Sequence, residues 1–189
     1  WYVNCSDGLN TNFSETRNFT KDATNPTVDF TANTESDGAH KSETYVFIEV
    51  LITEEYNYNY ANFTLYNSDG SINASNSTTS LTASNTTSVN FTGLDEGVYL
   101  YNVTVYDKAT LSGSTFTRNI TLDTSNPTVS TITPTSGNEN TAYNFTANVS
   151  DTVGVTNCIF QIDGDNNGTM TITGGVANIT FIFDAPGIY

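Results

Sequence analysis

Asparagine followed two positions later by Ser or Thr recurs along the whole of this sequence. Such triplets are acceptor sites for N-linked glycans in secreted proteins. Their density is about twice what the composition gives by chance, although strands that alternate apolar residues with Asn and Thr also generate the motif. Strand alternation explains Asn73, Asn76 and Asn85 least well. We expect glycans at several of the acceptors, which are Asn4, Asn12, Asn18, Asn62, Asn73, Asn76, Asn85, Asn90, Asn102, Asn119, Asn144, Asn148, Asn167 and Asn178.

The segment DGDNNG at 163–168 has the oxygen-ligand spacing of a calcium loop. Asp163, Asp165 and Asn167 could supply oxygens around a turn. The bidentate Glu that completes an EF-hand is missing, because Gly174 occupies the twelfth position. The same letters also spell a hairpin turn. Two interpretations therefore stay open, Ca²⁺ binding and a plain turn.

The sequence offers little for catalysis. Its one histidine, His40, lies in the polar stretch ESDGAHKSE, so a Ser-His-Asp triad would depend on a single exposed residue. Adjacent acids such as Glu54 and Glu55 point to opposite faces of a strand, which does not suit a glycosidase. We expect no enzymatic activity and no required cofactor.

Composition sets the class of protein. The chain has 189 residues, a net charge of −15 and five Lys plus Arg. Nucleic acids and anionic membranes are bound through basic patches, so we expect neither as a partner. The longest apolar run, residues 45–52, contains Glu49 and is shorter than the roughly 18 residues of a membrane helix. Abundant Ser, Thr and Asn with 12% aromatic residues is typical of an extracellular all-β chain.

Internal repeats indicate how the chain is divided. The stretch TRNFTKDATNPTV at 16–28 recurs as TRNITLDTSNPTV, 101 residues later. Just upstream, WYVNCSD at 1–7 matches the end of GVYLYNVTVYD at 97–107. Residues 1–24 are therefore predicted to be the final two-strand hairpin of a domain.

One complete domain is predicted at 25–125, where six alternating segments are separated by turns. Six or seven short strands in about 100 residues predict an immunoglobulin-like β-sandwich. Residues 126–189 supply five such segments and stop at APGIY, which parallels DEGVY at 95–99. We expect this third part to be a sandwich that lacks its last two strands, the pair that residues 1–24 carry.

The repeats also give the chain a resemblance to a known class. GVYLYNVTVYD with TRNITLDTSNPTV, and WYVNCSD with TRNFTKDATNPTV, resemble the final hairpin and linker of immunoglobulin-like repeats in bacterial and archaeal surface proteins, which include PKD-like and Big-like domains. The WDFGDG signature of PKD domains is absent, and FQIDGDN at 160–166 only echoes it. The resemblance implies a spacer, adhesin or surface-layer role.

The missing strands are not expected to come from the same unit. A sandwich of this size is roughly 35 to 40 Å long, and Pro stiffens both short linkers, DATNP and DTSNP. We expect residues 1–24 of one unit to complete 126–189 of the next, either between separate subunits or within one long repeat polypeptide. The expected function is a non-catalytic unit of a glycosylated extracellular filament or stalk at the cell surface. The alternative is a glycan-binding adhesin module.

Two cysteines lie in this expected junction. Cys5 faces inward on the hairpin, and Cys158 opens the strand that should lie beside it. In the complete domain Val105 and Phe63 take their places, so both cysteines are gained together. We expect a disulfide across the junction, with two buried free thiols as the alternative.

Three tyrosines and two arginines are further candidates for a structural or binding role. Tyr56, Tyr58 and Tyr60 are predicted on one face of a strand, where they would pack in a core or form a platform for a sugar. Arg17 and Arg118 occupy equivalent repeat positions. Each is predicted to close the end of a sandwich through a salt bridge or an aromatic stack.

Overall fold

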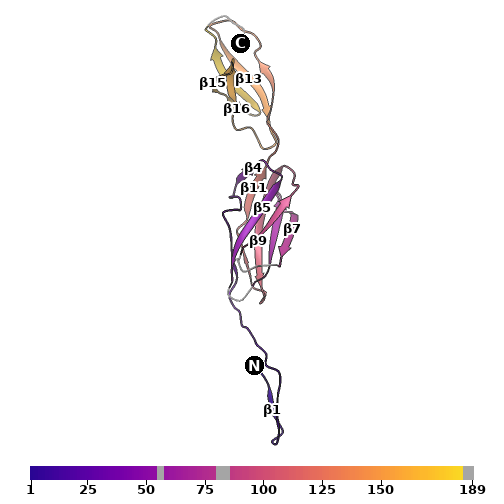
Figure 1. The fold of residues 1–189 in the computed structure, drawn as a ribbon. Coiled ribbons are helices and arrows are strands. Elements are labelled where there is room, and N and C mark those ends of the chain that lie inside the picture. The colour runs from indigo at the N-terminus through magenta and orange to yellow at the C-terminus, as the bar shows by residue number, and fades with distance from the viewer. Residues whose placement is uncertain (55–57, 80–85, 185–189) are drawn as a thin grey trace.

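The computed structural model describes residues 1–54, 58–79 and 86–184. Across these ranges the chain is all-β and contains no helix, which confirms the predicted fold class. A hairpin, a central sandwich and a C-terminal sandwich follow one another along the chain (Figure 1). None of the described segments is a helix with the length and apolarity that crossing a membrane requires.

Two facing sheets form the central sandwich. The order in the larger sheet is β4 (Ala39–Lys41), β11 (Arg118–Leu122), β9 (Gly97–Asp107), β6 (Tyr58–Asn67) and β7 (Ile72–Thr78), with β10 (Ser112–Ser114) also on β9. The smaller sheet has the order β3 (Thr27–Phe30), β5 (Tyr45–Thr53) and β8 (Thr86–Thr92). β9 organises the larger sheet, because it pairs with β6, β10 and β11.

Alternating side chains build the central core between these sheets. On β5 every second residue from Val46 to Ile52 is fully buried, whereas Leu51 points outward and is 46% exposed. The facing sheet contributes further fully buried side chains, which are Ala61, Phe63, Leu65, Tyr101, Val103, Val105 and Ile120. Full burial of a large apolar side chain contributes about 1.5 to 3 kcal/mol, so this core holds the sandwich together.

The C-terminal sandwich has fewer strands. Its larger sheet has the order β12 (Thr128–Thr133), β13 (Ala142–Ser150), β17 (Val176–Ile182) and β16 (Thr171–Thr173). Its second sheet is the hairpin of β14 (Ile159–Ile162) and β15 (Asp165–Thr169). The buried cluster in the described part of this sandwich consists of Ala147, Val149 and Ala177, all small or medium in size.

The N-terminal hairpin consists of β1 (Asn4–Ser6) and β2 (Thr11–Phe13). Every residue from Trp1 to Lys21 is exposed. An extended linker places the hairpin beyond one end of the central sandwich, and the C-terminal sandwich lies beyond the other end (Figure 1).

We predict that Ile48→Ala will lower the free energy of unfolding of the central sandwich by about 2 to 5 kcal/mol, because it leaves a cavity in a closely packed core. Leu51→Ala, on the same strand but facing solvent, is the matched control and should cost far less. Native-state hydrogen exchange of the β5 and β9 amides measures both. Equal losses in the two variants would contradict this description of the core.

Candidate functional site

The N-terminal hairpin repeats the last hairpin of the central sandwich, pair by pair. After alignment of the two repeats, the register of β1 on β2 is that of β9 on β10. The matched pairs are Asn4–Phe13 with Thr104–Ser114, Cys5–Asn12 with Val105–Gly113, and Ser6–Thr11 with Tyr106–Ser112.

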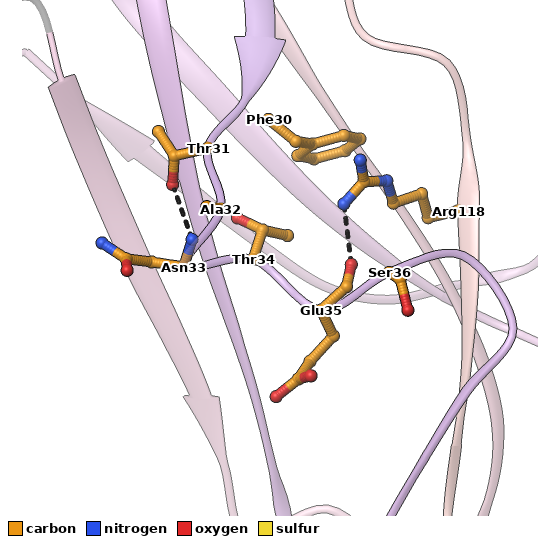
Figure 2. Close-up of a pocket in the computed structure, with 8 residues that line it drawn as sticks. All are labelled: Phe30, Thr31, Ala32, Asn33, Thr34, Glu35, Ser36 and Arg118. Carbon is orange, nitrogen blue, oxygen red and sulfur yellow. Dashed lines mark hydrogen bonds between the residues drawn. The ribbon is translucent and has the colours of Figure 1, made fainter.

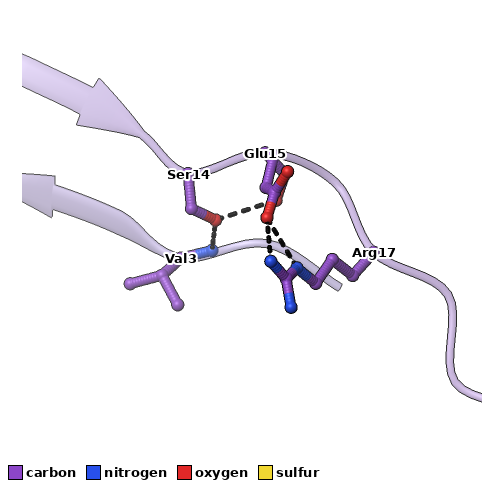
Figure 3. A network of polar contacts seen from close by, with 4 residues as sticks. All are labelled: Val3, Ser14, Glu15 and Arg17. Atoms are coloured by element: carbon purple, nitrogen blue, oxygen red, sulfur yellow. Dashed lines mark hydrogen bonds and ion pairs between the residues drawn. The ribbon is translucent and has the colours of Figure 1, made fainter.

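Hydrogen bonds next to these ladders match as well. The Ser14 amide donates to the Val3 carbonyl at 2.8 Å, as the Thr115 amide does to the Val103 carbonyl at 3.0 Å. The Ser14 hydroxyl accepts from the Val3 amide at 2.8 Å (Figure 3). In the central sandwich, the Thr115 hydroxyl accepts from the Val103 amide at 3.0 Å. The hairpin therefore already has the conformation of a sandwich's final strands, although it stands apart from both sandwiches.

The side chains that such strands bury are exposed on the hairpin. Tyr101 and Ile120 are fully buried in the central sandwich. Trp1 and Phe19, which occupy the equivalent repeat positions, are 64% and 80% exposed. The hairpin therefore presents an apolar face of the kind that marks an interaction surface.

The C-terminal sandwich repeats the central one as far as its strands go. β13 pairs with β12 and β17 in the registers that β5 makes with β3 and β8. β14 and β15 correspond to β6 and β7, since each hairpin carries one bulge, after Leu65 in one and after Phe160 in the other. This alignment equates Phe160 with Leu65 and Cys158 with Phe63. The predicted parallel of 185–189 with 95–99 lies outside the described residues.

Within the part of the chain that the structure describes, one edge of β14 lacks the neighbour that its counterpart has. β6 pairs with β9 from Tyr58 to Asn67. In the described ranges β14 pairs with β15 alone. The free N–H and C=O groups of such an edge are a template for another strand.

Behind this edge lies a cluster of phenylalanines. The Phe145 and Phe160 ring centroids are 4.9 Å apart, and those of Phe160 and Phe181 are 5.5 Å apart. All three rings are only half-buried, whereas Ile48 and Leu65, which correspond to Phe145 and Phe160, are fully buried. Among residues 126–184, the C-terminal sandwich therefore has an open apolar face beside its open edge.

Arg118 stacks on aromatic rings at the edge of the central sandwich. Its guanidinium carbon lies 4.3 Å from the Phe30 ring centroid and 5.1 Å from that of Phe116. Nη1 donates to the Glu35 carbonyl at 2.7 Å (Figure 2). Aromatic stacking, one of the two roles predicted for this arginine, is confirmed.

Arg17 has a different partner in the free hairpin. Its Nε donates to a Glu15 carboxylate oxygen at 2.6 Å, and the two side chains form an exposed ion pair (Figure 3). Glu15 occupies the repeat position of Phe116, so an ion pair replaces half of the aromatic stack seen around Arg118.

Both cysteines are free thiols in the single chain. Phe63 is paired with Val103 on β9, and Val105 lies two residues further along. If β1 took the place of β9, Cys158 would therefore lie opposite Val3 and diagonal to Cys5. Diagonal residues have Cα atoms about 7 to 8 Å apart, beyond the range that a disulfide bridges without backbone movement. The predicted disulfide thus requires a register shifted by two residues from that of β9 on β6.

The predicted calcium loop is the turn between β14 and β15. Asp163 lies in this turn with a φ of 53°, and Asp165 and Asn167 lie on β15. Asn167 Oδ1 accepts a hydrogen bond from the Ile162 amide at 3.0 Å, so this oxygen already stabilises the turn. Among the described residues, no group of three or more His, Cys, Asp or Glu is placed to hold a metal. Calcium binding stays a prediction, and the turn geometry alone accounts for these residues.

Acceptor asparagines divide by exposure. The exposed ones are Asn4, Asn12, Asn18, Asn73, Asn76, Asn90, Asn144 and Asn148. The half-buried ones are Asn62, Asn102, Asn119, Asn167 and Asn178. Asn62 Oδ1, for example, accepts from the hydroxyls of Ser75 and Ser77 at 2.9 and 3.1 Å. Asn85 lies outside the described residues. Glycosylation stays a prediction, with the exposed group as the more accessible acceptors.

The prediction that the β6 tyrosines share one face was wrong. A bulge between Tyr58 and Tyr60 puts them on opposite faces, because it adds one residue and reverses the alternation. Tyr58 packs against the core, and Tyr60 stacks on Tyr106 with ring centroids 4.8 Å apart. Tyr56 lies outside the described residues.

Comparison with known proteins gives no family: no family model and no curated protein matches the chain. Among solved structures, the fibronectin(III)-like modules of Clostridium thermocellum CbhA are similar at 18% identity and a TM-score of 0.42, over 82% of this chain and 78% of that one. CopC from Methylosinus trichosporium OB3b is similar at 12% identity and a TM-score of 0.39, over 47% and 85%. A CARDB domain from Pyrococcus furiosus, solved in complex with di-metal ions, gives 13% identity and a TM-score of 0.29, over 52% and 90%. The strand pairings of this chain themselves define the sandwich architecture.

Asp7 makes the hairpin turn sensitive to pH. Its Oδ1 accepts from the amides of Asn10 at 2.6 Å and Leu9 at 2.9 Å, and these bonds lower the pKa of Asp7 below the usual value of 3.8. Because the folded pKa is depressed, the stabilisation is present above 3.8 and is lost as the pH falls through the lower, folded value.

We predict that the amide chemical shifts of Leu9 and Asn10 will titrate together with a midpoint below 3.8. Two-dimensional NMR of the 15N-labelled chain measures this. Asp7→Asn, which keeps an acceptor but does not ionise, should remove the transition. A midpoint at or above 3.8 would show that these amides do not stabilise the carboxylate.

Proposed function

We propose that this chain is a non-catalytic structural unit of an extracellular, glycosylated filament or surface stalk, in which each unit joins the next head to tail. The observation that supports this function is a complementarity between the two ends. The N-terminal hairpin has the register of a sandwich's final strands, and β14 has an open edge where such strands belong. A contact between two different surfaces does not close on itself, so it extends into a filament.

The placement of the parts favours a neighbouring unit as the partner. The hairpin and the C-terminal sandwich lie at opposite ends of the central sandwich (Figure 1). A hairpin of the same chain would have to pass the whole length of that sandwich to reach β14. A contact between the hairpin of one unit and β14 of another is compatible with separate subunits and with successive repeats of one polypeptide.

Burial of the exposed apolar side chains of the hairpin would drive this contact between units. Trp1, Val3 and Phe19 are 64%, 51% and 80% exposed in the single chain. Burial of apolar area is favourable by roughly 25 cal/mol per Å², before the cost of ordering the partners. Since the hairpin is already paired within itself, little of its backbone remains to be ordered on docking.

The surface location rests on the sequence. The net charge of −15 and the many exposed acceptor asparagines suit a solvated, glycosylated exterior. The hairpin-and-linker repeats resemble those of PKD-like and Big-like surface proteins, for which spacer roles are expected. The glycan-binding alternative has less support, because Tyr58 packs against the core and Tyr60 and Tyr106 stack on each other.

Head-to-tail assembly predicts a particular mixing behaviour. Val3→Asp places a charge on the apolar face of the hairpin, and Phe160→Asp places one beside the β14 edge. The unmodified chain should form a concentration-dependent series of oligomers, and each variant alone should stay monomeric. An equimolar mixture should give a 1:1 dimer and nothing larger, since only one functional hairpin and one functional edge remain in the pair. Sedimentation velocity measures all four samples.

Leu9→Asp is the matched control, because it adds the same charge at the hairpin turn, where the side chain is 92% exposed. It should assemble like the unmodified chain. A monomeric unmodified chain at every concentration, or variants that assemble alone, would contradict the proposed function.

Glycosylation is predicted to follow exposure. In material from the native source, peptides that carry Asn73 and Asn76 should show a mass excess over the bare sequence, whereas half-buried Asn62 should be unmodified or modified to a smaller extent. Peptide mass spectrometry after chymotryptic digestion measures each site. Bare masses at Asn73 and Asn76 would remove glycosylation from the proposal and leave head-to-tail assembly in place.

A further inference from the structure

We infer that the hairpin of one unit docks on β14 of the next in a single register, with Trp1 opposite Phe160 and Val3 opposite Cys158. The inference rests on the proposed function and adds the identity of the contacting residues. The partner is a second copy of this chain, either as a separate subunit or as the next repeat of one polypeptide.

The register follows from two correspondences within this chain. In the central sandwich, Tyr101 pairs with Leu65 and Val103 pairs with Phe63. The β1–β2 ladder equates Trp1 and Val3 with Tyr101 and Val103. The bulges after Leu65 and Phe160 equate Phe160 with Leu65, and with it Cys158 with Phe63. A docked β1 would then extend the β14–β15 hairpin into one continuous sheet with β2 at its far edge.

Side-chain size supports this register at Trp1. In the central sandwich the Tyr101 ring packs edge-on against Phe30, with centroids 5.6 Å apart. The residue at the repeat position of Phe30 is Thr131, so an aromatic ring is lost from the C-terminal sandwich. Trp1 is larger than Tyr101 and faces Phe160, whose ring is half-buried among other phenylalanines. The indole therefore fills volume that the missing ring leaves.

At Asn12, the docked hairpin cannot make the contact that β10 makes in the central sandwich. A Cβ added to Gly113 would lie 2.0 Å from the Pro26 carbonyl oxygen, so β10 packs against the backbone of the linker there. Asn12 occupies the position of Gly113 on the hairpin and is an N-glycan acceptor. Pro127, the counterpart of Pro26, directly precedes β12 and must therefore lie further from the docked hairpin. A glycan on Asn12 would enlarge that conflict, so assembled material should carry Asn12 without one.

Engineered cysteines test directly which hairpin residue lies opposite Cys158 of a second copy. With Cys5→Ser as the common background, Val3→Cys should form a disulfide with Cys158 of a second copy, because directly opposed strand residues lie within bonding distance. Asn4→Cys in the same background is the matched control, since its side chain points to the other face. After oxidation, tryptic peptide 1–17 linked to peptide 119–189 should be about tenfold more abundant for Val3→Cys than for Asn4→Cys.

The native cysteines test the alternative register. An efficient Cys5–Cys158 link in the unmodified chain, together with no link in Val3→Cys, would overturn the inferred register by showing a shift of two residues, while head-to-tail assembly would stand. Oligomers that form without either link would overturn the register as well. The absence of oligomers from every sample would instead remove the proposed function itself.

Trp1→Ala gives a second, independent test without cysteines. Loss of a buried aromatic anchor at an interface should weaken association by about 30-fold or more. Leu9→Ala, at the hairpin turn and 92% exposed, should leave association unchanged. Equal affinities for the two variants would overturn the placement of Trp1 against Phe160.

Discussion

A β-sandwich is stable only when its two sheets together cover the apolar core. The central sandwich meets this constraint through β9, whose inward side chains Tyr101, Val103 and Val105 are fully buried. The C-terminal sandwich has no strand in that place among the described residues, and its phenylalanines stay half-buried. The proposed head-to-tail assembly follows from this one difference between the two sandwiches.

In the proposed assembly, the hairpin supplies the missing strand without changing its own conformation. Its ladder and its Ser14–Val3 contacts already match those of β9 and β10, although its turn is one residue shorter. The proposed association would therefore cost little backbone ordering, which is the usual advantage of a preorganised partner. The short, Pro-containing linker keeps the hairpin beyond the central sandwich, where the next unit can reach it (Figure 1).

Period-two alternation and turn residues predicted the all-β class, because both are local signals in the sequence. They could not predict the bulge between Tyr58 and Tyr60, which no single residue type specifies and which reverses the faces that follow. The cysteines show the same limit. The repeats predict that Cys5 and Cys158 lie in adjacent strands of the proposed assembly. Their offset there of two residues depends on the pairing register, which only the ladders define.

Hydrogen exchange measured against protein concentration tests the central claim most directly. In a head-to-tail assembly, the amides of residues 1–17 and those of β14 gain protection together as the concentration rises, while the amides of β5 do not change. This account predicts a common midpoint for the hairpin and β14. Protection of both segments that is independent of concentration in the separate 189-residue chain, or a rise in one segment without the other, would contradict it.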